Sequence, residues 1–334
     1  VLFRSRVGLD AEWQVTRLNT IRLGLSLGYA KYLNHSGLDT KSLLIDPGTQ
    51  FAFDVFIGEN VRVNIHDRIT IAQNPVDEAT LSNTSRFPRV QNASGLTAFI
   101  RFPDFDFVVG YDHFIFNTLS SEFSYLDRTE EQFFASVRRR VSDALRVGVE
   151  GSAAIVRYSD NVSSDATTWT AGAFADASLS SYTKLRISGG YQSMRFDGNG
   201  TNGDTKNFGS WYANLAASQR ISQYLSHTMT VGREARIGLG VNFTDYVFAR
   251  YAANWRMNDL LTWDFDAFLE DARDSGAPGA AAEHAFRWGG GVTLRFHLSS
   301  RSDLSLRYSY VDKDSNLPLR SYTQNSGILS LNYL

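Results

Sequence analysis

Residues 261–270 read LTWDFDAFLE, and apolar and polar side chains largely alternate along this stretch. Successive side chains of a β-strand point to opposite faces, so the alternation predicts a strand with one apolar and one polar face. The same period of two recurs in residues 21–28, 145–150, 292–297, 304–310 and 329–333. We therefore expect an all-β protein.

The length of these segments distinguishes between kinds of β-protein. We count about 17 alternating segments, most of them about 10 to 14 residues long. Strands of soluble proteins average about five to six residues, whereas strands that cross a bilayer need about nine to eleven. The segment lengths therefore predict a transmembrane antiparallel up-and-down β-barrel that spans residues 1–334 as a single outer-membrane domain.

The connections between segments support this prediction because short and long ones alternate. The short turns fall near residues 19, 58–60, 103–104, 142–143, 180–183, 222–223, 258–259 and 299–302. The long loops fall near residues 33–47, 73–88, 117–127, 158–166, 196–207, 233–241, 272–284 and 312–322. Short periplasmic turns and longer extracellular loops are typical of outer-membrane barrels.

The composition excludes several classes of site. The chain of 334 residues has no cysteine, which excludes disulfides, thiolate metal sites and a cysteine nucleophile. Its net charge of −2 gives no basic field for nucleic acid, so we expect no nucleic-acid partner. Five of the 33 basic residues are lysine, which leaves 28 arginines. No metal or other cofactor is predicted, and no apolar run is long enough for a transmembrane helix.

The two ends of the sequence suggest that it is a fragment. Residues 1–5, VLFRS, look like a translated sequencing-adapter tail, and no signal peptide is recognisable. The first and the last segment are both expected to run toward the periplasm. Because single-chain bacterial barrels have an even number of strands, we expect a missing N-terminal strand and about 18 strands when complete.

Nearly the whole chain resembles the β-barrel porin family of Gram-negative outer-membrane proteins, of the type found at exopolysaccharide loci. The residues that carry the resemblance are the hairpin rhythm and the stretches 126–132, 308–310, 314–316, 322–325 and 331–333. The resemblance implies an outer-membrane location and a pore or export role without a settled substrate. It also implies contact with outer-membrane lipid, lipopolysaccharide and the barrel assembly machinery; the oligomeric state stays unknown.

If the apolar phase faces lipid, the opposite phase lines the pore. The predicted pore-lining residues are Arg22, Arg62, Arg68, Arg101, Arg138, Arg146, Arg186, Arg250, Arg287, Arg295, Arg307, Asp264, Asp266 and Glu270. One interpretation is a charged filter for small anionic solutes or acidic glycans. The other is a network of arginine–carboxylate pairs that braces the wall, which we favour.

Two further features concern the outer face. Tyrosine and tryptophan gather near the segment ends and predict an interfacial girdle: Trp13, Tyr29, Tyr158, Trp169, Tyr182, Tyr191, Trp211, Tyr251, Trp255, Trp288 and Tyr308. Asp67, in contrast, shares the lipid-facing phase with Ile65 and Ile69, where a carboxylate is costly. A bulge, a pair with Arg68 or an interface between protomers would each account for it.

No catalytic constellation is visible in the sequence, so we expect no enzyme. The adjacent pairs Asp112–His113 and His35–Ser36 are the nearest candidates, and chance explains both. The leading functional hypothesis is a porin-like channel for diffusion or export of polar solutes. The alternative is a structural or adhesive barrel whose lumen is closed, for example by loop 73–88 or 272–284, and whose extracellular loops bind a ligand.

Overall fold

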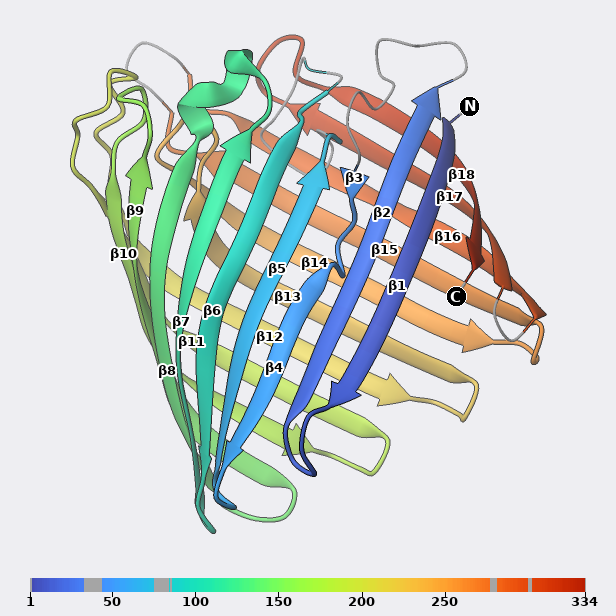
Figure 1. Cartoon of the computed structure of the whole chain (residues 1–334). Coiled ribbons are helices and arrows are strands. Elements are labelled where there is room, and N and C mark those ends of the chain that lie inside the picture. The colour runs from blue at the N-terminus through green and yellow to red at the C-terminus, as the bar shows by residue number, and fades with distance from the viewer. Residues whose placement is uncertain are drawn as a thin grey trace.

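The chain forms one closed β-barrel in the computed structural model (Figure 1). The structure describes residues 2–32, 44–74, 84, 86–276, 281–299 and 302–333. The described residues form 18 strands, and consecutive strands other than β3 (Leu44–Ile45) and β4 (Gln50–Ile57) pair in an antiparallel meander around the barrel. Within the described ranges, no helix is long and apolar enough to cross a membrane. The predicted all-β antiparallel barrel is confirmed.

Most strands have 12 to 16 residues, as the alternating segments predict. The strands of the first half are β1 Leu2–Gln14, β2 Thr20–Tyr32, β3 Leu44–Ile45, β4 Gln50–Ile57, β5 Val61–Ala72, β6 Arg89–Arg101, β7 Phe105–Thr118, β8 Arg128–Arg140 and β9 Leu145–Tyr158. Those of the second half are β10 Ala166–Ser178, β11 Thr183–Phe196, β12 Phe208–Arg220, β13 Leu225–Ile237, β14 Phe243–Arg256, β15 Leu261–Asp274, β16 His284–Ser299, β17 Ser302–Ser315 and β18 Tyr322–Tyr333.

One crossing of the wall is divided into two strands, β3 and β4. Residues 46–49 between them leave the ladder, and Gly48 takes a φ of 108°, which an L side chain rarely adopts. The Thr49 hydroxyl accepts a hydrogen bond from the Ser26 backbone N–H at 2.9 Å, so it replaces part of the interrupted ladder. This division explains why the structure has 18 strands where the sequence predicts about 17 segments.

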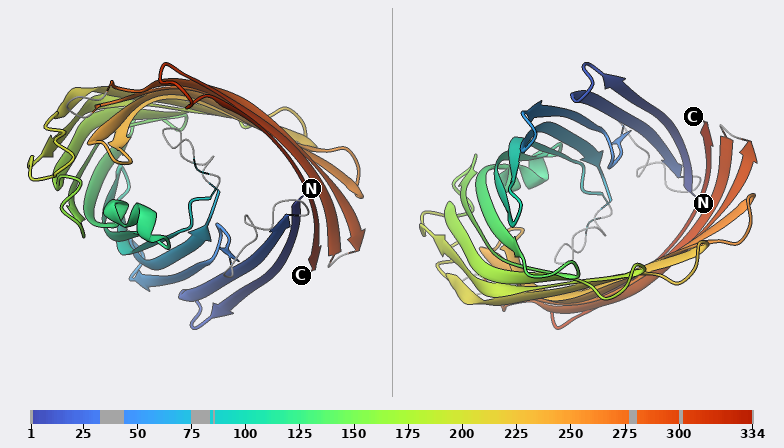
Figure 2. Two further views of the ribbon diagram at one scale, coloured as in Figure 1. Left: turned by 90° about the horizontal axis from the view of Figure 1, so that it is seen from above. Right: turned by 90° about the horizontal axis from the view of Figure 1, so that it is seen from below.

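The barrel closes between its first and last strands (Figure 2). β1 pairs with β18 in parallel, through Leu2 with Ile328 and Phe3 with Leu329. If β3 and β4 count as one crossing, 18 strands make 18 − 1 = 17 crossings. An odd number of crossings makes the first and last strands run in the same direction, so this seam is parallel.

The two ends of the barrel differ, as predicted. Short turns join the strands at one end, and the longer connections lie at the other (Figure 1). The 3-10 helix η3, Ser121–Leu126, lies at the long-loop end. Its Phe123 and Leu126 are buried against Phe87 and Phe116.

The apolar phase of the strands is exposed on the outside of the barrel. Trp13, Trp169 and Trp211 belong to this exposed set, as a lipid-facing girdle requires. Tyr158 differs from the prediction. It lies opposite Arg128 on the polar phase and packs against an enclosed apolar cluster that includes Val156.

Candidate functional site

The polar phase of the strands lies on the concave face of the wall. Its side chains contact one another across strands that are not neighbours. Arg186 of β11 reaches Glu150 of β9 at 2.7 Å, and the Tyr212 hydroxyl of β12 lies 3.4 Å from the same carboxylate. Side chains converge in this way only on the inside of a curved sheet, so these groups face the lumen.

All fourteen residues predicted from the sequence lie on this phase in the strand ladders, and most of them form ion pairs. The closest nitrogen–oxygen distances are Arg22–Asp54 3.1 Å, Arg62–Asp54 4.0 Å, Arg101–Asp106 3.6 Å, Arg138–Asp106 2.8 Å, Arg186–Asp176 3.1 Å, Arg250–Glu270 3.1 Å, Arg287–Glu270 2.6 Å, Arg295–Asp264 3.0 Å and Arg307–Asp266 2.8 Å. For Arg68 and Arg146, no ion pair with another described residue is present. Twelve of the fourteen residues therefore take part in arginine–carboxylate pairs.

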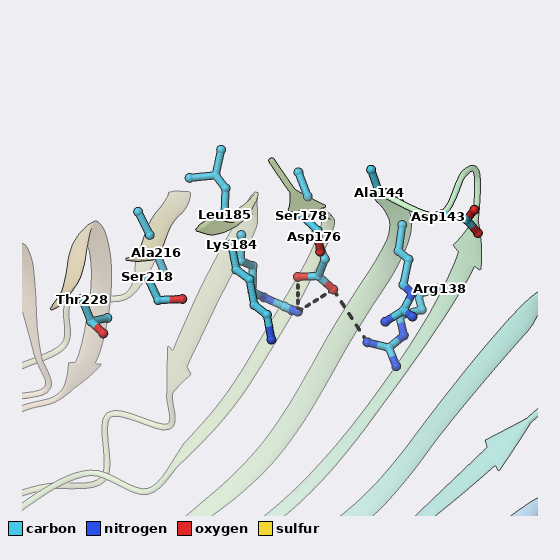
Figure 3. A pocket seen from close by; sticks show the side chains of 14 residues that line it. Arg138, Asp143, Ala144, Asp176, Ser178, Lys184, Leu185, Ala216, Ser218 and Thr228 are labelled. Carbon is cyan, nitrogen blue, oxygen red and sulfur yellow. Dashed lines mark hydrogen bonds and ion pairs between the residues drawn. The ribbon is translucent and has the colours of Figure 1, made fainter. Parts of the chain in front are cut away.

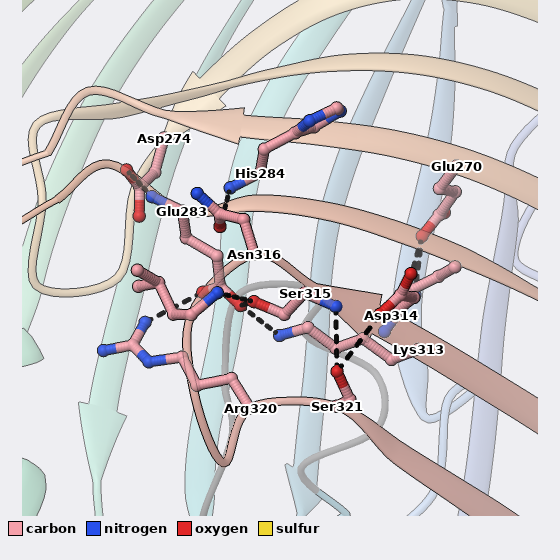
Figure 4. Close-up of polar contacts among 12 residues, drawn as sticks. Glu270, Asp274, Glu283, His284, Lys313, Asp314, Ser315, Asn316, Arg320 and Ser321 are labelled. Carbon is pink, nitrogen blue, oxygen red and sulfur yellow. Dashed lines mark hydrogen bonds and ion pairs between the residues drawn. The ribbon is translucent and has the colours of Figure 1, made fainter.

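A buried network occupies the long-loop end of the concave face. Glu270 of β15 accepts hydrogen bonds from Arg250 on one side and from Arg287 on the other. Further toward the loops, Glu283 lies between Lys313 and Arg320 (Figure 4). Glu270, Glu283, Arg287 and Lys313 are all buried.

Glu283 lies in the loop before β16 and is the centre of its part of the network. Burial raises the pKa of its carboxyl, but hydrogen bonds from Lys313 and Ser315, the Lys313 charge and the Arg320 hydrogen bond outweigh this effect. The net result is a pKa below the ordinary value of 4.5. Glu283 is therefore a carboxylate at neutral pH and fixes the loop end.

A second loop contact ties connections that are far apart in the sequence. Asp204, in the loop between β11 and β12, accepts a hydrogen bond from the Asn242 backbone N–H at 2.9 Å. The Ser275 hydroxyl donates to the same carboxylate at 2.5 Å. The loop end of the barrel is thus braced by polar contacts as well as by the apolar cluster around η3.

The turn end of the concave face is more open. It holds a pocket of about 490 Å³ between the ends of β8 and β13. Figure 3 shows Asp176 in this pocket, between Arg138 and Lys184. The charged lining consists of Arg138, Arg146, Lys184, Arg186, Asp143 and Asp176. Arg138 and Arg186 also pair with Asp106 and Glu150 just outside this lining, so Arg146 and Lys184 are the two lining cations that form no ion pair with a described residue.

Charge is not balanced locally in this pocket. Asp176 accepts hydrogen bonds from Arg186, lies 3.8 Å from Arg138 and stands opposite Arg146 in the ladder. Arg138 and Arg186 have second partners in Asp106 and Glu150, so Arg146 is the one of these three guanidinium groups that forms no ion pair with a described residue. On its other side, Arg146 stands directly opposite Arg140, and like charges in such positions destabilise a sheet. A bound anion would relieve this repulsion.

The structure divides one of the two enzyme candidates from the sequence, Asp112–His113, between the two faces of the wall. Asp112 faces the lumen, where it bonds the His66 Nε2 atom at 2.8 Å. His113 faces outward and bonds Glu131 at 2.9 Å. Asp112 and His113 are therefore on opposite faces of the barrel wall, although they are adjacent in the sequence. His35 and Ser36 lie outside the described residues.

Several members of the site were missed by the sequence reasoning. Tyr212 and His66 carry no charge signal in the sequence, and only strand pairing places them beside Glu150 and Asp112. Glu283 and Arg320 lie in predicted loops, so alternation could not assign them a face. Their charge marked them as candidates for an ion pair, but their positions in the sequence did not indicate that Lys313 would be the partner of Glu283.

No family model and no curated protein matches the sequence. Solved structures match in fold. The outer membrane channel DcaP of Acinetobacter baumannii has a TM-score of 0.51 at 12% identity, and the match covers 100% of this chain and 95% of that one. The FrpB iron transporter (F5-1 variant) from Neisseria meningitidis gives 0.53 at 10% identity, over 95% of this chain and 63% of that one. The copper transporter OprC gives 0.52 at 12% identity, over 100% and 63%.

These similarities identify the fold as that of outer-membrane β-barrels. The chain spans less than two thirds of the FrpB and OprC chains and nearly the full length of DcaP. The resemblance to porins of the exopolysaccharide-locus type has no match of its own and stays a prediction.

Proposed function

We propose that this protein is a channel of the Gram-negative outer membrane that passes polar solutes and prefers anions. The observation that carries the proposal is that Arg146 and Lys184, in the pocket at the turn end of the lumen, form no ion pair with a described residue. Most other lumen charges are neutralised in pairs, so the unpaired cations of this pocket dominate the local field. Cations fixed at a constriction attract anions and repel cations.

The proposed path for an anion follows from the unequal pairing. An anion that enters the pocket would meet Arg146 and Lys184, for which the described residues offer no ion-pair partner. The paired arginines, such as Arg186, hold the wall in shape and contribute less net charge. Transport in this scheme requires no chemistry on the solute, and we propose no catalytic role.

The proposed orientation places the short turns, and thus the pocket, on the periplasmic side. The outer face would then contact lipid and lipopolysaccharide, and the barrel assembly machinery would insert the chain. Acidic polysaccharide is the finer proposal for the solute, because its carboxylates match the pocket in charge. Small organic anions share that chemistry.

The alternative function is a closed barrel with binding loops. The buried network around Glu283 and the cluster around η3 support it, because both hold the long-loop end in a fixed arrangement. Loops 73–88 and 272–284, the two proposed plugs, include residues 75–83, 85 and 277–280, which lie outside the described ranges.

The deciding experiment is a planar-bilayer recording of the purified protein under a potassium chloride gradient. The proposal predicts stable conductance steps with a reversal potential displaced toward the chloride equilibrium potential. A folded barrel that inserts but gives no steps would favour the closed alternative. Steps with a reversal potential on the potassium side would refute the proposed anion preference.

A further inference from the structure

An unbroken row of polar side chains crosses the outer face of the barrel. In the ladders, Asp67 of β5 stands opposite Ser94 of β6, Ser94 opposite His113 of β7, and His113 opposite Glu131 of β8. We call these four residues the polar row. They share the phase of the exposed apolar residues Ile65, Leu96, Val109 and Phe133.

The polar row is an ordered structure with internal hydrogen bonds. The Asn92 amide donates to Asp67 at 2.6 Å, and the His113 Nδ1 atom lies 2.9 Å from Glu131. The Tyr111 hydroxyl donates to the other oxygen of Glu131. These contacts hold the carboxylates in place but leave them on the outer surface. Ser94 Oγ and His113 Nε2 have no hydrogen-bond partner among the described residues.

Contact with lipid acyl chains is energetically unfavourable for the polar row. Asp67 lies in the middle of β5, with Ile65 and Ile69 on either side, so acyl chains would surround its carboxylate. Arginine and lysine on the lipid face cost up to about 2–4 kcal/mol near the bilayer midplane, and a carboxylate costs less but is still destabilising there. Lipopolysaccharide phosphates are also a poor match, because the row carries two carboxylates.

We propose that the outer face of β5–β8 binds a second copy of this chain, in a dimer whose two-fold axis passes between Ser94 and His113 along the membrane normal. The proposal rests on the membrane location proposed above. Two copies in one membrane must share their orientation, so the axis has to be normal to the bilayer. In a two-fold contact, each residue that touches a partner residue is touched by the same residue in return.

Geometry makes the row complementary to itself about this axis. Strands of such barrels tilt by about 40°, so a row perpendicular to them is inclined to the membrane plane. The rows of two copies related by the axis therefore cross at its centre. There the Ser94 hydroxyl meets the partner's His113, and His113 meets the partner's Ser94. These are the two groups with free hydrogen-bonding capacity.

The carboxylates at the ends of the row are kept apart by the same crossing. Asp67 and the partner's Glu131 lie at different heights, separated by three strand spacings of about 4.8 Å along the inclined row, or about 9 Å in height. The face from β4 to β9 is about 24 Å wide and about 25 Å tall. Two such faces bury roughly 1,200 Å², the lower limit of a stable interface.

The absence of cysteine from the sequence makes a direct test possible. A Ser94→Cys variant is treated in native outer membranes with a short bismaleimide crosslinker, because facing sheets pack about 10 Å apart, beyond the reach of a disulfide. A single cysteine can be linked to its own copy by so short a reagent only close to a two-fold axis. After heating and denaturing electrophoresis, we expect most of the variant to run as a crosslinked dimer. Met229→Cys, exposed on β13, is the matched control and is expected to stay monomeric.

A second measurement covers the case in which the cysteine variant misfolds. Native mass spectrometry of the unmodified protein is expected to show a dimer, and the Ser94→Ala/His113→Leu variant a monomer. Heat-shifted migration on unboiled gels verifies the folded barrel, and membrane fractionation verifies its location. Folded, membrane-located protein that is monomeric, that is trimeric, or that carries lipopolysaccharide without a second chain would overturn the dimer while leaving the channel proposal intact.

Discussion

Glu283 and Lys313 form an ion pair that is closed to solvent on both sides. The Lys313 Nζ atom lies 2.9 Å from the Glu283 Oε1 atom, and neither side chain exposes any of its surface. The pair joins the loop before β16 to the upper part of β17. Arg320 adds a second contact to Glu283 at 2.8 Å from the loop before β18.

Removing the carboxylate should destabilise the barrel strongly. In Glu283→Gln the Lys313 ammonium stays buried and loses the Glu283 counter-charge, for which we expect a loss of about 3–5 kcal/mol in the free energy of unfolding. Urea unfolding in detergent micelles measures it. Arg320→Gln is the control, with an expected loss of about 1 kcal/mol, because Arg320 is half-exposed and Lys313 remains to neutralise Glu283. Equal losses in the two variants would contradict this account.

The ion pair of Glu283 and Lys313 should make the free energy of unfolding depend on pH in the acidic range. The folded-state pKa of Glu283 lies below its ordinary value of 4.5, so its contribution is complete above pH 4.5 and is lost as the pH falls through the lowered pKa. We expect the urea midpoints of the wild type and Glu283→Gln to differ most at neutral pH and to converge as the pH falls below 4.5. A difference that grows with acidity would show the opposite sign of the shift.

The unpaired cations of the turn-end pocket should set ion selectivity. Lys184→Gln or Arg146→Gln removes one charge; at about 6 Å in water a unit charge contributes about 0.7 kcal/mol. Since the charge attracts chloride and repels potassium by this amount each, we expect each substitution to lower the chloride-to-potassium permeability ratio about tenfold, measured as a shift of the reversal potential. Arg157→Gln, on the outer face, is the control and should leave the ratio unchanged. An unchanged permeability ratio in both pocket variants would show that this pocket does not set the ion selectivity.

A tight contact between two glycines on the lumen face should not tolerate a side chain. Gly172 and Gly190 stand opposite each other, and a Cβ on Gly190 would collide with the backbone of Ala171 and Gly172. We expect Gly190→Ala to cost about 1–3 kcal/mol in unfolding free energy. Gly327→Ala is the matched control in β18, where a Cβ meets no atom within 4 Å. It should be neutral or stabilising by up to about 1 kcal/mol.

Much of the fold could be predicted because its decisive signal is local. The alternation in 261–270 recurs along the chain, and the structure has strands where it occurs. The faces were also predictable, since the fourteen predicted lumen residues share the concave phase. Partner choice was harder to predict. Arg295 with Asp264 could be expected from hairpin order, whereas Arg186 with Glu150 joins strands that are not neighbours and depends on the curvature of the wall.

Asp67 shows the same division between sequence and structure. Its lipid-facing phase was evident from Ile65 and Ile69, and an interface was one of three interpretations. The polar row was not evident, because Ser94, His113 and Glu131 are separate in the sequence and only the ladder registers place them side by side.

The sequence by itself determined the strands, their approximate number, their two faces and the asymmetry of the connections, because side-chain direction in a strand is fixed by a period of two residues. Only the tertiary structure decided the parallel closure of β1 on β18, the burial of Glu283 with Lys313 and the positive pocket around Asp176. These features depend on strand register, on barrel curvature and on which loops meet. They arise from contacts between residues far apart in the chain, which no local pattern records.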